Sequence, residues 1–164
     1  MNDLREYRNQ FTEQGYAVIP NIFSAIETEN IKQVTEQSDK SKETFRKSAD
    51  LFAIRQFLKE LPNAVNHILN ACLVNTIREI FGQGYFITKS IYFDKPGASN
   101  WYVAYHQDLT ISVDNKIETE GFGPWTTKQN QFAVQPPLSF LENNFTVRIH
   151  LDETNEDNGA LKVI

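Results

Sequence analysis

His106 and Asp108, near the middle of the chain, have the residue types and spacing of a metal site. Because they are two positions apart, their side chains leave the same face of the backbone wherever the segment is extended. The two α-carbons are then about 6–7 Å apart, which lets an imidazole and a carboxylate reach one metal ion. Such a pair supplies two ligands of the 2-His-1-carboxylate triad that holds non-haem Fe(II). The same pair also occurs by chance as a histidine beside a loop carboxylate, so alone it indicates only a candidate site.

The elements that must position this pair are predicted to be β-strands. Aromatic and β-branched residues alternate along several segments of the second half of the chain, which favours extended structure. These segments are residues 85–93, 101–108, 110–113 and 145–151, with Asn158-Gly159 turning the chain into an apolar strand at 160–164. Residues 114–135 have two glycines, one proline and no sustained period, and we expect a long surface loop there.

The first half of the chain predicts helices. One is expected near residues 3–13 and is stopped by Gly15, and a second near 25–37 follows a capping box of Ser24 and Glu27. Apolar residues at helical spacing between Pro62 and Phe81 predict one long helix or two stacked helices. Residues 38–48 are charged and are predicted to form a loop. We therefore expect an α+β chain with a mainly β core, as a single domain over 1–164 with a helical part at 1–83 and a β part at 84–164.

Composition excludes several classes of protein. The 164 residues, 40% hydrophobic, are enough for one core, and a net charge of −5 without a basic run disfavours nucleic-acid binding. No apolar stretch approaches the roughly 20 residues of a membrane span, and the charged N-terminal residues lack a secretory pattern, so we expect a cytoplasmic protein. The single Cys72 excludes an internal disulfide and fits a small buried hydrophobe.

Several separated motifs resemble the phytanoyl-CoA dioxygenase family. They are the string 101–108, the preceding Phe93-Asp94-Lys95-Pro96-Gly97, residues 146–152, Asn158-Gly159-Ala160-Leu161 and the opening segment 15–20. The helices between them match less specifically. The resemblance implies a double-stranded β-helix (a jelly-roll, cupin-like fold) after N-terminal helices. It also implies Fe(II), 2-oxoglutarate and O2 as cofactor and cosubstrates, and hydroxylation of a small organic molecule.

The resemblance also implies roles for individual residues. His106 and Asp108 would be catalytic iron ligands, Gln107 would lie beside the cosubstrate, and Lys95 matches the Lys-Pro that precedes the motif. In the family, Asn-Gly-x-Leu is followed by Pro-Gly-Ser-His, a second histidine ligand and an arginine that binds the oxo acid. Those residues would follow Ile164. We therefore expect an incomplete domain that binds iron weakly, is inactive as it stands and self-associates through open sheet edges.

Three further side chains are candidates for the pocket. His150 and Arg148 share one face of the expected strand, where they would serve as a substitute ligand and an anion anchor, although a solvated sheet face is the stronger explanation for them. Lys89 interrupts an apolar strand face and would either meet a carboxylate of the cosubstrate or substrate, or extend to solvent. His67, in a helical segment, is a weaker candidate.

Aromatic rings in the expected loop suggest a lid. Phe122, Trp125 and Phe132 lie near Gly121, Gly123 and Pro124, and would either close over the substrate and the open metal positions or pack on a sheet edge. Two other functions stay open: a non-catalytic binding or assembly module of the same fold, and a cupin-like metal isomerase that uses His106 and Asp108 without an oxo acid.

Overall fold

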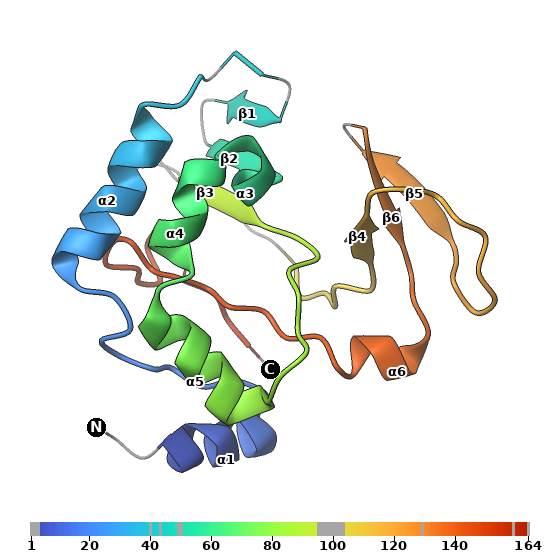
Figure 1. Cartoon of the computed structure of the whole chain (residues 1–164), viewed down its shortest axis with the longest axis horizontal. Helices are drawn as coiled ribbons and strands as arrows, with labels where there is room; N and C mark the ends of the chain where they lie inside the picture. Colours follow the sequence, from blue (N-terminus) through green and yellow to red (C-terminus); the bar gives the residue numbers. More distant parts are fainter. Residues whose placement is uncertain are drawn as a thin grey trace. The chain divides into compact units, whose positions relative to one another are not determined.

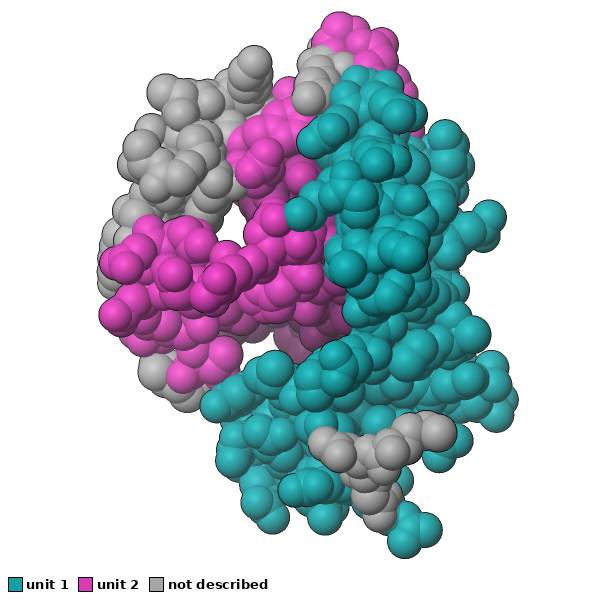
Figure 2. All heavy atoms as spheres, turned by 90° about the vertical axis from the view of Figure 1, so that its left-hand side faces the viewer, with its two compact units in different colours: residues 1–38, 61–86 teal, residues 39–60, 87–164 magenta. Residues whose placement is uncertain are grey.

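The computed structural model describes most of the chain (Figure 1). The described residues are 4–39, 41–42, 44–48, 51–94, 104–128, 130–158 and 160–163. The chain divides into two compact units, coloured separately in Figure 2. The first unit comprises residues 1–38 and 61–86, and the second comprises residues 39–60 and 87–164.

The first unit is helical. Its elements are α1 (Leu4–Gln14), α2 (Ala25–Glu36), the 3-10 turn η1 (Pro62–Ala64), α4 (Val65–Ile68) and α5 (Ala71–Phe81). Helix α1 packs on α5, and α2 contacts α4 and η1. The ring of Phe11 meets that of Phe81 edge-on at 4.9 Å, and Ile31 is 1% exposed. The apolar faces seen in the sequence therefore form the buried side of this unit.

Local signals in the sequence fix the ends of these helices. The predicted capping box is confirmed, since the Ser24 hydroxyl accepts from the Glu27 N–H and the Glu27 carboxylate accepts from the Ser24 N–H. Gly15 and Gly82 follow α1 and α5 with φ of +76° and +93°. Those left-handed conformations favour glycine, so both helices end where the sequence predicts.

The apolar period over 62–81 covers more than one helix. The chain forms η1, α4 and α5 there, so the single long helix is wrong and the divided alternative is closer. The division falls at Leu69 and Asn70, where the Asn70 side chain accepts a hydrogen bond from the Leu73 N–H at 2.8 Å and caps α5. Helical spacing does not reveal such a division, because both pieces turn their apolar residues toward the same neighbours.

The second unit contains an antiparallel sheet in the order β1-β2-β3. The strands are β1 (Phe45–Ser48), β2 (Leu51–Arg55) and β3 (Ile91–Asp94), and helix α3 (Phe57–Glu60) contacts β2 and β3. Ile54 is fully buried, and the Phe57 ring stacks on Tyr92 at 5.6 Å. The strands β1 and β2 correct the expectation of a loop at 38–48 and of helices throughout 1–83. Both strands are short: β1 pairs only with the adjacent β2, and β2 pairs on its other side with the distant β3, a partner that the local pattern does not reveal.

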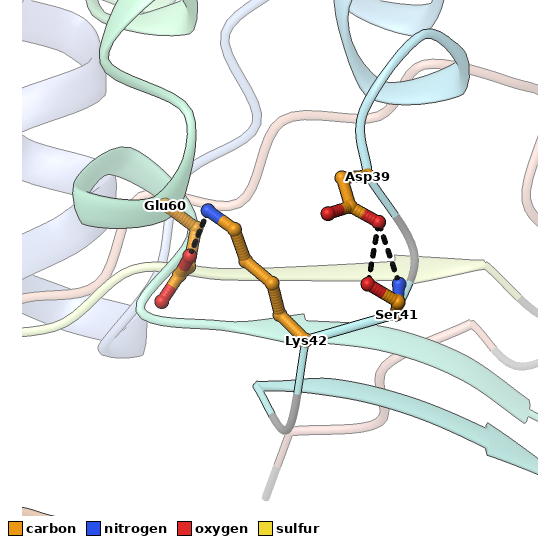
Figure 3. Close-up of polar contacts among 4 residues, drawn as sticks. All are labelled: Asp39, Ser41, Lys42 and Glu60. Atoms are coloured by element: carbon orange, nitrogen blue, oxygen red, sulfur yellow. Dashed lines mark hydrogen bonds and ion pairs between the residues drawn. The ribbon is translucent and has the colours of Figure 1, made fainter.

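Polar contacts connect the segment before β1 to α3 (Figure 3). The ammonium of Lys42 lies 2.8 Å from the carboxylate of Glu60. This hydrogen bond lowers the pKa of Glu60 and raises that of Lys42. The carboxylate of Asp39 accepts from the hydroxyl of Ser41 at 2.7 Å and from its N–H at 3.0 Å, which lowers the pKa of Asp39.

A second antiparallel sheet has the order β4-β6-β5. Its strands are β4 (Ile111–Val113), β5 (Trp125–Lys128) and β6 (Gln131–Val134), followed by helix α6 (Leu138–Leu141). Val134 pairs with Ile111 on one side and with Trp125 on the other, so these three side chains share one face. The expectation of an unstructured loop over 114–135 is wrong, because β5 and β6 form a hairpin within it.

Several predicted strands are shorter than expected or absent among the described residues. Of 85–93 only residues 91–93 belong to a strand, while 104–110, 145–150 and 160–163 are irregular. Residues 95–103, which include the first three residues of the string 101–108, lie outside the described residues, as does Gly159 of the expected hairpin turn. Alternation shows that a segment suits a sheet, but a strand forms only where a neighbour pairs with it.

The fold class is thus α+β with small antiparallel sheets. A closed double-stranded β-helix is not formed by the strands described. Among the described residues, no helix combines the length and the apolar character needed to span a membrane.

Candidate metal centre

His106 lies on an exposed irregular segment, residues 104–110, that leads into β4. Its Nδ1 atom is 2.8 Å from the carbonyl oxygen of Ala104. Because a carbonyl oxygen only accepts hydrogen bonds, Nδ1 is the donor, and in the neutral ring the lone pair is at Nε2. Metal-binding histidines commonly donate their second nitrogen to a backbone carbonyl in this way, which fixes the tautomer and the direction of the coordinating nitrogen.

Asp108 and Gln107 lie on the same exposed segment. The imidazole and the carboxylate are therefore both accessible to an ion from solvent, two positions apart. Among the residues that the structure describes, no three histidine, cysteine, aspartate or glutamate side chains form a group that could hold a metal. The pair is suited to supply two ligands, and a third must come from outside the described set or from solvent.

His150 is not brought into a group with His106 and Asp108, as the same result shows for the described residues. Its Nδ1 atom instead lies 3.1 Å from the hydroxyl of Thr154. Desolvation of the ring, and then the positive charge of Arg148, lower the pKa of His150. Arg148 and His150 are both exposed on the irregular segment 144–150, so the shared strand face expected for them is absent.

The remaining polar candidates are spread along the chain. Lys89 is exposed and precedes β3 rather than lying in a strand, so the apolar strand face assigned to it is a misreading of the period. Lys95 lies outside the described residues. His67 belongs to α4 in the helical unit, and Cys72, expected to be buried, is exposed in α5. The buried side chains of α5 are Leu73, Thr76 and Ile80, and Cys72 lies off that face.

The aromatic candidates belong to the second sheet and its flanks. Trp125 is in β5 and Phe132 in β6, both half-buried, and Phe122 contacts Phe140 edge-on at 5.4 Å. Trp125 and Phe122 line an open hollow of about 300 Å³, together with apolar and polar side chains from β4, β6 and the connection after β4. Sequence reasoning missed those other lining residues: Val113, Asp114, Asn115, Ile117, Thr119 and Val134.

One residue signals the missed hairpin. Asn130 lies between β5 and β6 with a φ of +57°, a left-handed conformation that asparagine adopts more readily than most residues. Asparagine in a short connection between β-branched and aromatic residues is a known hairpin signal, but no glycine follows Asn130 to strengthen it.

The donor set at 106 and 108 fits Fe(II). Imidazole nitrogen favours iron over magnesium or calcium, and one carboxylate halves the charge of a divalent ion. The backbone contact of His106 leaves Nε2 for coordination, and both side chains are exposed. The two side chains are thus chemically suited to act as two ligands of a facial triad.

Comparison with known proteins identifies the family. The family model described as phytanoyl-CoA dioxygenase (PhyH) matches residues 11–164. No curated protein and no solved structure matches the chain significantly. Because the family match covers nearly the whole sequence, the resemblance seen in the motifs is confirmed. The chain belongs to the phytanoyl-CoA dioxygenase family, whose members are generally Fe(II)- and 2-oxoglutarate-dependent oxygenases.

Proposed function

We propose that this chain is catalytic-domain sequence of a dioxygenase that uses Fe(II) and 2-oxoglutarate to hydroxylate a small organic molecule. The observation that carries the proposal is the Nδ1 contact of His106 with the Ala104 carbonyl, which leaves Nε2 ready to coordinate a metal two residues before Asp108. Family membership supplies the reaction type. When bound, the iron and the oxo acid provide the oxidative chemistry, and the residues of the chain provide binding and orientation.

In this proposal, each residue of the exposed segment has a separate task. Nε2 of His106 and the carboxylate of Asp108 hold the metal on one side, and Gln107 between them faces the cosubstrate. Lys95 and Lys89 are proposed to attract the carboxylates of the oxo acid, and Arg148 to contribute a further positive charge near the site. The support for the lysines and Arg148 is their charge and, for Lys95, the family motif.

The proposal includes completion of the site by sequence after residue 164. The family pattern places a second histidine and an arginine after Pro-Gly-Ser-His. The strands that carry these residues would close the double-stranded β-helix. Reading the coding sequence beyond Ile164 tests this directly. A continuation into Pro-Gly-Ser-His supports the triad, and a stop codon or an unrelated continuation contradicts it.

Open sheet edges support a proposal of self-association. In the described part of the chain, β4 and β5 each pair with β6 on one side only. An unpaired strand edge presents N–H and C=O groups that a second chain can use. Sedimentation velocity over a range of concentrations should show reversible association of the 1–164 chain, and a monomer at every concentration would exclude this form of pairing.

Anaerobic absorption spectroscopy tests the iron and oxo-acid proposal. Fe(II) in excess is added to the chain, followed by 2-oxoglutarate, and the visible metal-to-ligand charge-transfer band is recorded. The band is expected only when the oxo acid chelates the bound iron. Substitutions His106→Ala and Asp108→Ala should each abolish this band, because a site with only two protein ligands binds iron weakly and the loss of either ligand removes the remaining affinity.

Matched variants separate loss of ligands from loss of structure. His67→Ala, in α4, and Asp157→Ala, in an exposed turn, should leave the band unchanged. A band that persists in Asp108→Ala would remove Asp108 from the site. Iron binding without any response to 2-oxoglutarate would instead favour a metal enzyme that uses no oxo acid.

A further inference from the structure

An open hollow lies on one face of the sheet formed by β4, β6 and β5. Its volume is about 300 Å³, within the range of small-molecule sites. Val134 lines it, is 1% exposed and pairs with Trp125 on one side and with Ile111 on the other. Val113, a further lining residue, is two positions after Ile111, so its side chain leaves the same face. The paired strands therefore give the hollow an apolar wall.

The connection between β4 and β5 completes the lining with Asp114, Asn115, Ile117, Thr119 and Phe122. Several contacts hold this connection in place. The Phe122 N–H donates to the Thr119 carbonyl at 3.1 Å, and the Phe122 ring meets that of Phe140 edge-on at 5.4 Å. The Gly123 N–H donates to the Gln135 carbonyl at 2.9 Å, just after β6. The hollow is thus shaped by contacts within the chain.

One charged side chain belongs to the lining. Of the residues that line the hollow in the described part of the chain, Asp114 alone carries a charge. Its side chain is 83% exposed, and its carboxylate lies 3.5 Å from the ammonium of Lys59, which is itself 67% exposed. Exposed ion pairs of this kind contribute little to stability. The carboxylate of Asp114 can therefore release Lys59 and turn to a cation that enters the hollow.

The neighbouring charges are not in the described lining. The ammonium of Lys116 lies 3.3 Å from the carboxylate of Glu118 and 5.8 Å from the centre of the Trp125 ring. A ligand in the hollow meets apolar side chains and the carboxylate of Asp114, while the positive charge of Lys116 has its own partner. The hollow is therefore complementary to a molecule that is apolar at one end and positively charged at the other.

We propose that this hollow binds a small organic ammonium ion, in which an apolar ring or short chain carries one protonated amine that pairs with the carboxylate of Asp114. The apolar part contacts Val113, Val134 and Phe122, where the removal of its surface from water is favourable. A carboxylate ligand of the same shape would be repelled by Asp114. The site uses neither iron nor 2-oxoglutarate, so it goes beyond the proposed reaction.

Titration of the metal-free 1–164 chain with three probes of similar shape tests the site. At pH 7, 2-phenylethylamine is protonated, 2-phenylethanol is neutral and 3-phenylpropanoate is negatively charged. The readout is the set of methyl resonances of Val113, Ile117 and Val134 in ¹H–¹³C spectra, which the ring current of a bound phenyl group shifts. Ile117→Val assigns one of these signals.

The protonated amine should shift the lining methyl groups in a saturable manner. It should bind about 2–5-fold more tightly than 2-phenylethanol, the gain expected of one exposed ion pair, and 3-phenylpropanoate should bind more weakly than both. Added salt should reduce the preference for the amine, because it screens an exposed pair. The affinity for 2-phenylethanol should change less.

Three substitutions at exposed side chains locate the charge. Asp114→Asn keeps the size of the side chain and removes its charge, so it should bind the amine and the alcohol equally. Glu120→Gln is the matched control: it removes the same charge from the same connection, outside the described lining, and should keep the preference. Lys59→Gln removes the competitor for Asp114 and should tighten binding of the amine but not of the alcohol.

Four results would overturn the inference. They are no saturable shift with the amine, equal or tighter binding of the alcohol or the carboxylate, a preference for the amine that survives in Asp114→Asn, and a loss in Glu120→Gln as large as in Asp114→Asn. None of them depends on iron, so each is distinguishable from failure of the proposed oxygenase function.

Discussion

The imidazole Nδ1 of His106 lies 2.8 Å from the carbonyl oxygen of Ala104, two residues earlier in the chain. The contact joins the candidate ligand to its own backbone, so the ring has a fixed direction without help from any distant element. It also decides which nitrogen carries the proton. A histidine held in this way is prepared to coordinate through Nε2.

The tautomer of His106 is directly measurable. Because Nδ1 donates to Ala104, the neutral ring should carry its proton on Nδ1, and long-range ¹H–¹⁵N correlation spectra at alkaline pH should show this. His67→Ala and His150→Ala assign the signal by elimination, since the chain has three histidines. A proton on Nε2 would mean that the contact with Ala104 does not hold in solution.

His150 should titrate below its ordinary pKa of 6.5, because desolvation and then the charge of Arg148 disfavour the imidazolium form. The unfolded chain then takes up this proton first, so stability falls as the pH drops through 6.5 and stops falling below the folded pKa. NMR titration of the ring gives the pKa. Arg148→Gln should raise it partway, and a value at or above 6.5 in the unsubstituted chain would contradict the prediction.

Asn70 connects two helix starts in the first unit. Its side chain caps α5 through the Leu73 N–H and donates to the Glu27 carboxylate at 2.8 Å and to the Ile22 carbonyl at 3.1 Å. Asn70→Ala should therefore destabilise the chain by about 1–2 kcal/mol, the upper part of the range for N-cap loss. Urea unfolding measures the change.

Ser24→Ala is the matched comparison for Asn70→Ala, because Ser24 caps α2 without a contact to a second helix in the described contacts. It should cost less than Asn70→Ala. Equal losses for the two variants would show that the contacts of Asn70 with Glu27 and Ile22 add nothing to its role as a cap.

The β5-β6 hairpin depends on the left-handed backbone of Asn130, whose φ is +57°. Asn130→Ala should lower the free energy of unfolding by about 1 kcal/mol, since alanine has neither the glycine freedom nor the asparagine side chain. Asn130→Gly should be close to neutral. Thermal unfolding of both variants measures the difference, and an alanine variant as stable as the glycine variant would exclude strain at this position.

The sequence predicts best where the information is local. The capping box of Ser24 and Glu27 and the glycines after α1 and α5 act within one helical turn, and the ends of those helices follow from them. The spacing of His106 and Asp108 is also local. It identifies a candidate ligand pair before any tertiary contact is known.

Pairing between distant segments explains what the sequence does not predict. Strand β2 pairs with the distant β3 as well as with its neighbour β1, whereas the alternating residues 145–150 are irregular and pair with no described strand. The indole nitrogen of Trp125, which is buried without a hydrogen-bond partner among the described residues, is likewise a result of packing. Composition predicted an aromatic segment there, but the hollow forms only when β4, β5 and β6 come together.

Paramagnetic broadening by Mn(II) tests the central claim, that His106 and Asp108 together bind the metal. Mn(II) accepts nitrogen and oxygen ligands as Fe(II) does, with lower affinity, and does not require exclusion of air. The chain has three histidines, and the broadening of each ring signal is measured separately, which shows which histidine lies nearest the bound metal. We predict that substoichiometric Mn(II) broadens His106 first, that Asp108→Ala removes this effect and that Asp157→Ala does not. Broadening of His67 or His150 before His106, or an unchanged response in Asp108→Ala, would contradict the account.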